Sequence, residues 1–358
     1  MQGEKQYKTG LDVGSTTAKI VIIDESGQTV FSRYERHNAQ VNDLLSAYFR
    51  EARQELGDIE TSIAVTGSVG MGTAEQLRTE FIQEVVAATR YAQQLYPSAS
   101  ALIDIGGEDA KVVLFQGNHI DLRMNGNCAG GTGAFIDQMA VLLGVDIEEL
   151  SRLALQAEHI HPIAARCGVF SKTDIQNLVS RNVPLGDIAA SIFHAVAVQT
   201  IVTLSRGWTF HPPILLCGGP LTFIPALRKA FADYLHLQES DFILPAGGNL
   251  LPALGCALCA TEEKAVALST LENLISRSTD ITTKNSLPPL FDSETDYDNW
   301  KKEKAHYNWP SAPLVQRIQE AVLGIDSGST TTKIVVTTPD GAILFSHYAP
   351  NLGNPIEA

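Results

Sequence analysis

The sequence of 358 residues is 44% hydrophobic and 18% charged, a composition typical of a folded globular protein and not of a disordered chain. Its 26 Lys and Arg against 40 Asp and Glu give a net charge of −14, which argues against a nucleic-acid partner, because neutralising phosphates needs clustered cations. We find no apolar run of the roughly 20 residues that a membrane span needs and no signal-peptide core, so we expect a cytoplasmic protein with no membrane partner.

Residues 1–97 predict a first α/β lobe. Its alternating and apolar segments predict strands at 7–14, 18–24, 28–35 and 61–66 and helices at 40–56 and 74–95, the last carrying Glu84.

The same order restarts in residues 98–270, which predict a second lobe. Strands are expected at 101–105, 111–116, 119–124 and 213–217, and helices at 134–144, 146–157, 174–180, 186–207, 221–235 and 250–268. Because each half opens with strand–Asp–x–Gly–strand, we predict an α/β fold of two similar lobes with a cleft between them.

One segment of the sequence is repeated. Residues 9–34, TGLDVGSTTAKIVIIDESGQTVFSRY, match residues 323–348, LGIDSGSTTTKIVVTTPDGAILFSHY. We therefore expect residues 319–358 to be the truncated start of a second domain and the polar, proline-containing residues 271–318 to be a linker. A single hairpin is marginally stable, so we expect the truncated start to be disordered or to pair with an exposed sheet edge.

Two glycine turns are candidate phosphate loops. One runs from Asp12 to Thr17 and is followed by Lys19, and the other runs from Asp104 to Asp109 and is followed by Lys111. Glycine lets backbone amides approach phosphate, and an acid at a strand end can hold Mg²⁺-bound water. The alternative is two ordinary hairpin turns, but their equivalent places in the two halves favour a nucleotide site. The P-loop and Rossmann patterns are absent from the sequence.

Two cysteines flank glycine-rich turns. Cys128 lies in NGNCAGGTGAF, just before a predicted helix, and Cys167 lies in RCGVFS. A helix N-terminus stabilises a thiolate or a thiolate-bound cluster. Two thiolates are half of the set that a [4Fe–4S] cluster normally takes, so a symmetric dimer or a second repeat would have to provide the others. The alternative is two small residues packed in turns.

The remaining metal-binding residue types favour structural interpretations. Cys256 and Cys259 lie three residues apart in an Ala/Leu helix, where small buried residues are expected, and Cys217 ends a core strand. The EHIH segment at 158–161 is expected to be a solvated loop, and His194 a core histidine.

The two loops and the late Gly218-Gly219 turn resemble the superfamily of actin, Hsp70 and sugar kinases. This resemblance implies an actin-like, two-lobed ATPase with duplicated ribonuclease-H-like lobes. It also implies that Asp12 and Asp104 organise Mg²⁺ and water, and that Glu84 lies near the attacked phosphate. The residues that it suggests for ATP or ADP binding are Gly14, Ser15, Thr16, Thr17, Lys19, Gly106, Gly107, Glu108, Gly131, Thr132, Gly218 and Gly219.

Residues 8–268, with the motifs DIGGEDAK, NxxCAxGTGxF and CGVFSKTDI, closely resemble the ATP-dependent activators of 2-hydroxyacyl-CoA dehydratases and the ATPase subunits of benzoyl-CoA reductase. The resemblance implies an ATPase coupled to electron transfer, in a homodimer whose bridging [4Fe–4S] cluster is bound by Cys128 and Cys167. A ferredoxin or flavodoxin would donate the electron, and a dehydratase-like protein would receive it. A small-molecule kinase and a non-catalytic nucleotide-dependent binding module are the alternatives.

Overall fold

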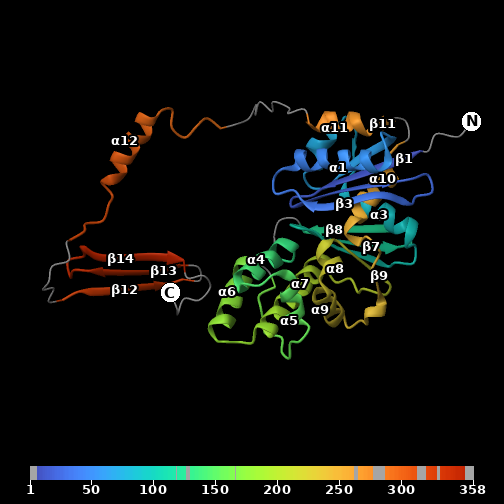
Figure 1. Cartoon of the computed structure of the whole chain (residues 1–358). Helices are drawn as coiled ribbons and strands as arrows, with labels where there is room; N and C mark the ends of the chain where they lie inside the picture. Colours follow the sequence, from blue (N-terminus) through green and yellow to red (C-terminus); the bar gives the residue numbers. More distant parts are fainter. Residues whose placement is uncertain are drawn as a thin grey trace, which may run out of the picture. The chain divides into compact units, whose positions relative to one another are not determined.

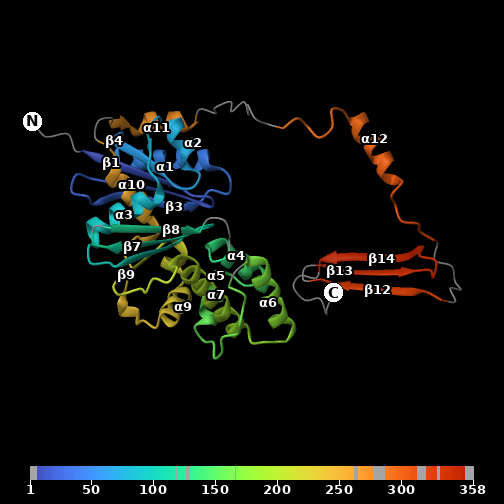
Figure 2. The same cartoon turned by 180° about the vertical axis from the view of Figure 1, so that it is seen from behind.

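The computed structural model describes residues 6–117, 119–125, 130–165, 167–261, 265–276, 287–312, 320–328 and 331–350. They form two compact units, which Figures 1 and 2 draw from opposite sides. The larger comprises Met1–Ile175 and Val183–Ser278, and the smaller comprises Gln176–Asn182 and Thr279–Ala358.

The first sheet of the larger unit has the strand order β11-β4-β1-β2-β3, with β5 beside β4. Its strands are β1 (Tyr7–Val13), β2 (Thr17–Ile23), β3 (Thr29–Arg36), β4 (Glu60–Thr66), β5 (Glu80–Phe81) and β11 (Ala265–Ala267). The strands β1, β2 and β3 form an antiparallel meander, and β4 runs parallel to β1.

Helices cover both faces of this sheet. They are α1 (Val41–Leu56), α2 (Gly70–Leu77), α3 (Glu84–Leu95), α10 (Leu251–Cys259) and α11 (Leu268–Ser276). Apolar side chains of α1, α2 and α11 share one buried core with those of β1, β2 and β4. Ala253 and Ala257 of α10 pack on Val21 and Ile23 of the opposite face. Figure 1 shows α1 and α11 on the outer face of the sheet.

The second sheet repeats this topology. Its order is β10-β9-β6-β7-β8, and its strands are β6 (Ala101–Ile105), β7 (Ala110–Gln116), β8 (His119–Asn125), β9 (Ile214–Cys217) and β10 (Phe242–Ile243). Here β6, β7 and β8 form the antiparallel meander and β9 runs parallel to β6. The two lobes therefore share one arrangement of four strands, as the sequence predicts, and they differ at the edge, where β10 runs parallel to β9 but β11 runs antiparallel to β4.

The helices α3 and α10 also pack against the second sheet, so they bury apolar surface in both lobes. The other helices of the second lobe are α4 (Gly133–Leu143), α5 (Ile147–Ala154), α6 (Gly168–Ser180), α7 (Leu185–Ser205), α8 (Gly219–Phe223) and α9 (Pro225–Leu235). Short 3₁₀ turns lie at Glu239–Asp241 and Gly248–Leu250.

The helix α7 corrects the expectation that no segment has the length of a membrane span. Its 21 residues are long and apolar enough to cross a bilayer, but 72% of its most apolar window is buried inside the unit. Asp187, Ser191 and Gln199 are buried along it. The helix therefore belongs to the packed core of the second lobe.

Two long helices expected from the sequence are wrong, because the chain breaks each of them. The segment 74–95 is interrupted at Arg78, whose left-handed backbone (φ 56°) ends α2, and β5 then pairs with β4 before α3 begins at Glu84. The segment 250–268 is interrupted after Cys259, and β11 pairs with β4. In both places strand pairing outweighs helix propensity.

The smaller unit contains α12 (Glu294–Ala305) and a sheet of β12 (Val322–Ser327), β13 (Thr331–Thr337) and β14 (Ile343–Pro350). The repeated sequence forms the same meander as β1–β3, with Asp326 opposite Lys333 as Asp12 is opposite Lys19. The segment expected to be a linker is more structured than predicted, since α11 continues to Ser276 and α12 lies within it.

Candidate functional site

Each lobe sets an aspartate opposite a lysine on its first hairpin. Asp12 pairs in register with Lys19, and Asp104 with Lys111. Both aspartates are almost fully buried, at 0% and 2% exposure. The Lys19 Nζ donates to Asp12 Oδ2 at 2.7 Å, while the Lys111 Nζ lies 3.9 Å from Asp104 Oδ2. The two predicted acids are therefore equivalent in position but not in their ion pairs.

Lys111 lies at the centre of a buried group of carboxylates. Its Nζ is 2.6 Å from Glu84 Oε1 and 2.9 Å from Asp109 Oδ1. Burial works against its charge, but Asp104, Glu84 and Asp109 outweigh this and raise the pKa of Lys111. Burial raises the pKa of Glu84 to about 7, because Lys111 offsets it only in part. Burial also raises the pKa of Asp104. Glu84 is therefore poised to exchange a proton near neutral pH.

A glycine with positive φ lies against each aspartate. Gly67 (φ 100°) follows β4, and Gly218 (φ 86°) follows β9. A Cβ on Gly67 would lie 2.6 Å from Asp12 Oδ1, and one on Gly218 would lie 2.5 Å from Asp104 Oδ1. Only glycine fits at either place. Sequence patterns pointed to Gly218 but not to Gly67, although Gly67 also ends a predicted strand.

The two lobes touch through their loops. A Cβ on Gly107 would lie 2.3 Å from Thr16 Oγ1, and one on Gly219 would lie 2.5 Å from the Tyr34 hydroxyl oxygen. The predicted phosphate loops are thus brought against each other, and the late glycine turn meets the first sheet.

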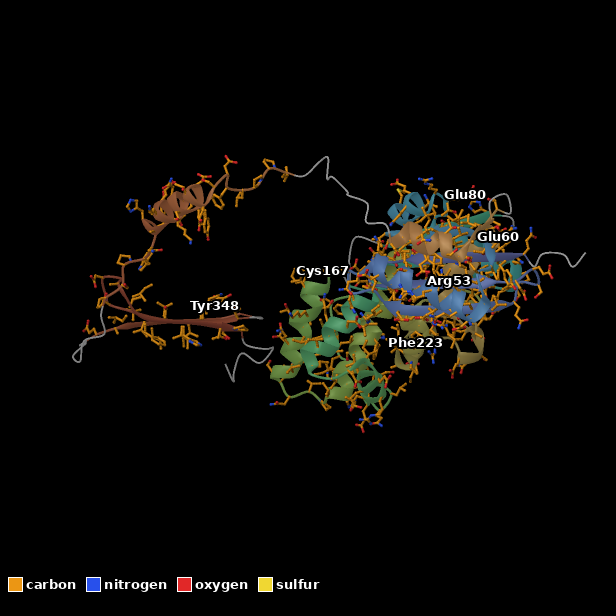
Figure 3. All side chains as sticks on the ribbon, turned by 45° about the horizontal axis from the view of Figure 1, so that its top comes forward. Arg53, Glu60, Glu80, Cys167, Phe223 and Tyr348 are labelled. Carbon is orange, nitrogen blue, oxygen red and sulfur yellow. The ribbon has the colours of Figure 1, made fainter. Side chains whose placement is uncertain are left out.

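A pocket of about 790 Å³, its open mouth included, lies where these loops meet. Its polar side contains Thr16, Thr17, Lys19, Glu84 and Asp104, and its apolar side contains Ile136, Ile147, Pro220, Phe223 and Ile224. Phe223 is 60% exposed and is labelled in Figure 3. The mixed polar and apolar lining suits a ligand with a charged and an apolar end.

Most of the predicted nucleotide-binding residues line this pocket. They are Thr16, Thr17, Lys19, Glu84, Asp104, Gly106, Gly107, Gly218 and Gly219. Asp12 lies behind Lys19, and Gly14 and Ser15 are in the same turn. Glu108 is exposed beside the second loop.

Gly131 and Thr132 are outside the lining. Gly131 lies against Gln199 and Thr200, and the next two residues, Gly133 and Ala134, line the pocket.

Several residues at the pocket rim were not predicted from the sequence. Arg36 forms an ion pair with Asp137 across the lobes at 2.8 Å, and the rings of Tyr34 and Phe223 lie 5.8 Å apart. The repeat carried a signal for one of them, since Tyr34 matches Tyr348. The contacts of Arg36 and Phe223 join distant segments, and no local pattern marks them.

The structure describes one of the two candidate cluster cysteines. Cys128 lies outside the described residues. Cys167 is a free, half-buried thiol directly before α6, and Figure 3 shows it at the end of that helix. Its neighbour Gly168 lies against Gly130, because a Cβ on Gly130 would be 3.0 Å from the Gly168 backbone nitrogen. Among the described residues, no three His, Cys, Asp or Glu side chains are grouped to hold a metal ion.

The other cysteines are structural where they are buried. Cys217 and Cys256 are 0% exposed, as expected for core residues, and burial raises the pKa of each thiol. Cys259 is half-buried at the end of α10. The 158–160 part of the EHIH segment is exposed, as predicted. His194 is half-buried against the Tyr234 ring.

The sequence profile of the BadF/BadG/BcrA/BcrD ATPase family matches residues 9–260. The chain belongs to this ATPase family. The match covers both lobes and every described residue of the pocket lining, and it confirms the resemblance drawn from the sequence motifs.

Relatives of this chain are similar over most of the larger unit. The 2-hydroxyisocaproyl-CoA dehydratase activator of Clostridioides difficile is 28% identical over 75% of this chain and 100% of its own length. The (R)-2-hydroxyglutaryl-CoA dehydratase activating ATPase of Acidaminococcus fermentans is 28% identical over 72% of this chain and 98% of its own length. The activator of lactoyl-CoA dehydratase of Anaerotignum propionicum is 28% identical over 72% of this chain and 98% of its own.

Solved structures establish the fold. The C. difficile activator with bound ADPNP has a TM-score of 0.60 and 26% identity, covering 77% of this chain and 99% of that one. The A. fermentans dehydratase component A has a TM-score of 0.62 and 24% identity, covering 74% and 98%. This chain therefore has the actin-like ATPase fold that the resemblance implies.

Proposed function

We propose that this chain is an ATP-hydrolysing activator that passes a low-potential electron to a partner enzyme resembling the 2-hydroxyacyl-CoA dehydratases. The observation that carries the proposal is one pocket lined by two equivalent glycine loops, with a buried acid and lysine at each. The names of the relatives, which are dehydratase activators, support the choice of partner. We place the protein in the cytoplasm, where ferredoxin or flavodoxin would supply the electron.

ATP would bind with its phosphates between the loops and its base on the apolar side. Thr16, Thr17 and Lys19 would contact phosphate oxygens through hydroxyl and ammonium donors. Mg²⁺ would be held beside the first loop, where Asp12 Oδ1 and Thr66 Oγ1 are buried without hydrogen-bond partners on paired strand positions. Such orphaned oxygens normally bind an ordered water or ion. Bound Mg²⁺ would neutralise phosphate charge during hydrolysis.

Glu84 is our candidate for the residue that receives a proton from the attacking water. It lines the pocket, and its pKa of about 7 lets the deprotonated form exist at neutral pH. A general base works best when its pKa is close to the working pH. Lys111 holds the carboxylate of Glu84 in place at 2.6 Å.

The cysteine segments fit the cluster proposal. Gly130 contacts Gly168, and in the sequence Cys128 precedes Gly130 by two residues and Cys167 precedes Gly168 by one. One chain would provide two thiolates, and a second copy or a second repeat would provide the other two of a [4Fe–4S] cluster. The cluster would hold one electron at low potential until the partner accepts it.

Backbone hydrogen bonds connect the second loop of the pocket with α4, which follows Cys128 in the sequence. The backbone N–H groups of Gly133 and Ala134 donate to the carbonyl oxygens of Gly106 and Gly107 at 2.9 and 2.7 Å. The first turn of α4 is thus fixed to the second phosphate loop, and α4 directly follows the segment with Cys128. A movement of that loop on hydrolysis would displace the cysteine segment, and a switch of this kind needs such a mechanical connection.

Anaerobic reconstitution tests the electron-transfer part. The wild type, Cys128→Ser, Cys167→Ser and the control Cys259→Ser are treated with iron and sulfide, and then iron content and the EPR spectrum of the reduced protein are measured. We expect a cluster signal in the wild type and in the control and its loss in the other two variants. Cluster-free wild type, or a full signal in Cys128→Ser, would contradict the proposal.

A separate assay tests the nucleotide part. We expect Mg²⁺-dependent ATP hydrolysis, with Asp104→Asn and Glu84→Gln slower by about 100-fold, the usual range for loss of a general base or charge-positioning group. ATP turnover that requires an added sugar or carboxylate would instead indicate a small-molecule kinase.

A further inference from the structure

His37 directly follows β3 and is 8% exposed. Its Nε2 lies 3.0 Å from the carbonyl oxygen of Gly14, and its Nδ1 lies 3.1 Å from the backbone nitrogen of Ala39. A carbonyl oxygen only accepts and a backbone N–H only donates, so Nδ1 accepts from Ala39 and Nε2 donates to Gly14. The ring therefore donates a hydrogen bond into the first phosphate loop.

The carbonyl oxygens of this loop are engaged by donors of the chain itself. His37 Nε2 donates to Gly14, the His37 backbone nitrogen donates to Thr16 at 3.2 Å, and the Gly14 nitrogen donates to Thr17 at 2.9 Å. A loop that binds phosphate must present its N–H groups and keep its carbonyl oxygens away, because those oxygens repel an anion. His37 supplies two of these three restraints.

The second loop is held in the same way by different means. Gly133 and Ala134 donate to Gly106 and Gly107, and the Gly106 nitrogen donates to Asp109 at 2.9 Å. There every donor is a backbone N–H, which only a proline substitution would remove. In the first lobe one of the three donors is a side chain, so its contribution can be measured by conservative substitution.

We propose that His37 is a positioning residue for the nucleotide phosphates, acting through the carbonyl oxygen of Gly14 without touching the nucleotide. The inference rests on the proposed binding of ATP in the pocket. It does not depend on hydrolysis, on the cluster or on the partner enzyme.

Calorimetric titration with ADPNP and with adenosine tests the role. Four variants are compared with the wild type. His37→Phe and His37→Asn lose the donor to Gly14, and the amide nitrogen of His37→Gln takes the place of Nε2. The control is His119→Phe, at an exposed position of β8. Asn still offers an acceptor to the Ala39 N–H, so it keeps the turn after β3 and is the second test if the Phe variant does not fold.

Loss of the hydrogen bond weakens ADPNP binding in the Phe and Asn variants by about tenfold, the factor that one such bond represents. Binding of adenosine, which has no phosphate, stays within about twofold of the wild type, because the loop contacts only phosphates. His37→Gln recovers most of the ADPNP affinity, and His119→Phe changes neither ligand.

Two results overturn the inference. In one, ADPNP affinity is the same in the Asn and Gln variants, and in the other, adenosine and ADPNP weaken equally. A wild type that does not bind ADPNP would remove the proposed function as well, whereas normal wild-type binding with unchanged variants would remove only the role of His37.

Discussion

Gly67 and Gly218 occupy the same position in the two lobes, each directly after the strand parallel to the one that carries the lobe's aspartate. A Cβ on either would approach that aspartate's Oδ1 to 2.6 Å or less. The two glycines let a backbone turn pass close to the end of each hairpin, beside the carboxylate of its aspartate. The duplication therefore includes the surroundings of the acids as well as the strands.

Substituting these glycines is expected to disturb both stability and binding. Gly218→Ala and Gly67→Ala combine a positive φ with a clash, and we expect each to lower the free energy of unfolding by more than about 2 kcal/mol and to weaken ADPNP binding. Gly27 also has a positive φ of 80° but no heavy atom within 4 Å. Gly27→Ala should cost about 1 kcal/mol and leave binding intact. Urea unfolding and calorimetry measure both, and equal effects at all three positions would contradict the clash.

Glu84 should make stability depend on pH. Its folded pKa of about 7 lies above its ordinary 4.5, so the folded state retains the proton to a higher pH. The stability it contributes is full below about pH 4.5 and is lost as pH rises to about 7. Urea unfolding from pH 4.5 to 8 should show a steeper fall in the wild type than in Glu84→Gln, since Asp104 titrates in both. Parallel curves would show that Glu84 has an ordinary pKa.

The repeat offers a matched pair of lysines. Lys19 lines the pocket and pairs with buried Asp12, whereas Lys333 pairs with Asp326, which is 64% exposed. Lys19→Met should weaken ADPNP binding by about tenfold or more, and it should cost about 3 kcal/mol of stability because a buried carboxylate loses its partner. Lys333→Met should change neither quantity. Equal behaviour of the two variants would mean that Lys19 has no special role.

If the proposed cluster is correct, Gly130 should control its assembly without affecting nucleotide binding. A Cβ there would lie 2.9 Å from Gln199 Oε1 and 3.0 Å from the Gly168 nitrogen. We expect Gly130→Ala to separate the two cysteine segments and to reduce iron incorporation on anaerobic reconstitution. ADPNP affinity should stay at the wild-type value. Gly72→Ala, at an open position, is the control. Normal iron content in Gly130→Ala would show that the cluster does not require this contact.

The crossing of α3 and α10 should be the most sensitive packing contact. A Cβ on Gly255 would lie 1.8 Å from the Ala87 carbonyl oxygen, while one on Gly72 in α2 would meet no atom within 4 Å. Gly255→Ala should lower the free energy of unfolding by about 3 kcal/mol or more, because the helices must separate. Gly72→Ala should raise it by about 0.5 kcal/mol through helix propensity. An unchanged free energy of unfolding in Gly255→Ala would show that α3 and α10 can separate at little cost.

Much of the fold follows from local patterns. The hairpins of both lobes, the helix at α1 and the long α7 were readable because apolar residues recur with the period of each element. The broken helices were not readable, since the residues around Arg78 and Cys259 become strands only where β4 provides a partner. Glycine and aspartate spacing pointed to the two turns that the structure places around one pocket. His37, Tyr34 and Gly67 were missed because their roles arise from contacts between distant segments.

Residue order alone indicated the duplicated topology, the two glycine turns of the pocket and the family, because short runs of residues carry each of them. Gly10 and Gly324 illustrate what residue order left open. They are equivalent in the repeat, but a Cβ on Gly10 would lie 1.9 Å from the Ala253 carbonyl oxygen, and one on Gly324 would meet nothing nearer than 3.9 Å. Which of the two glycines has a helix packed on it is set by the folded chain, since close approach depends on which segments meet in space.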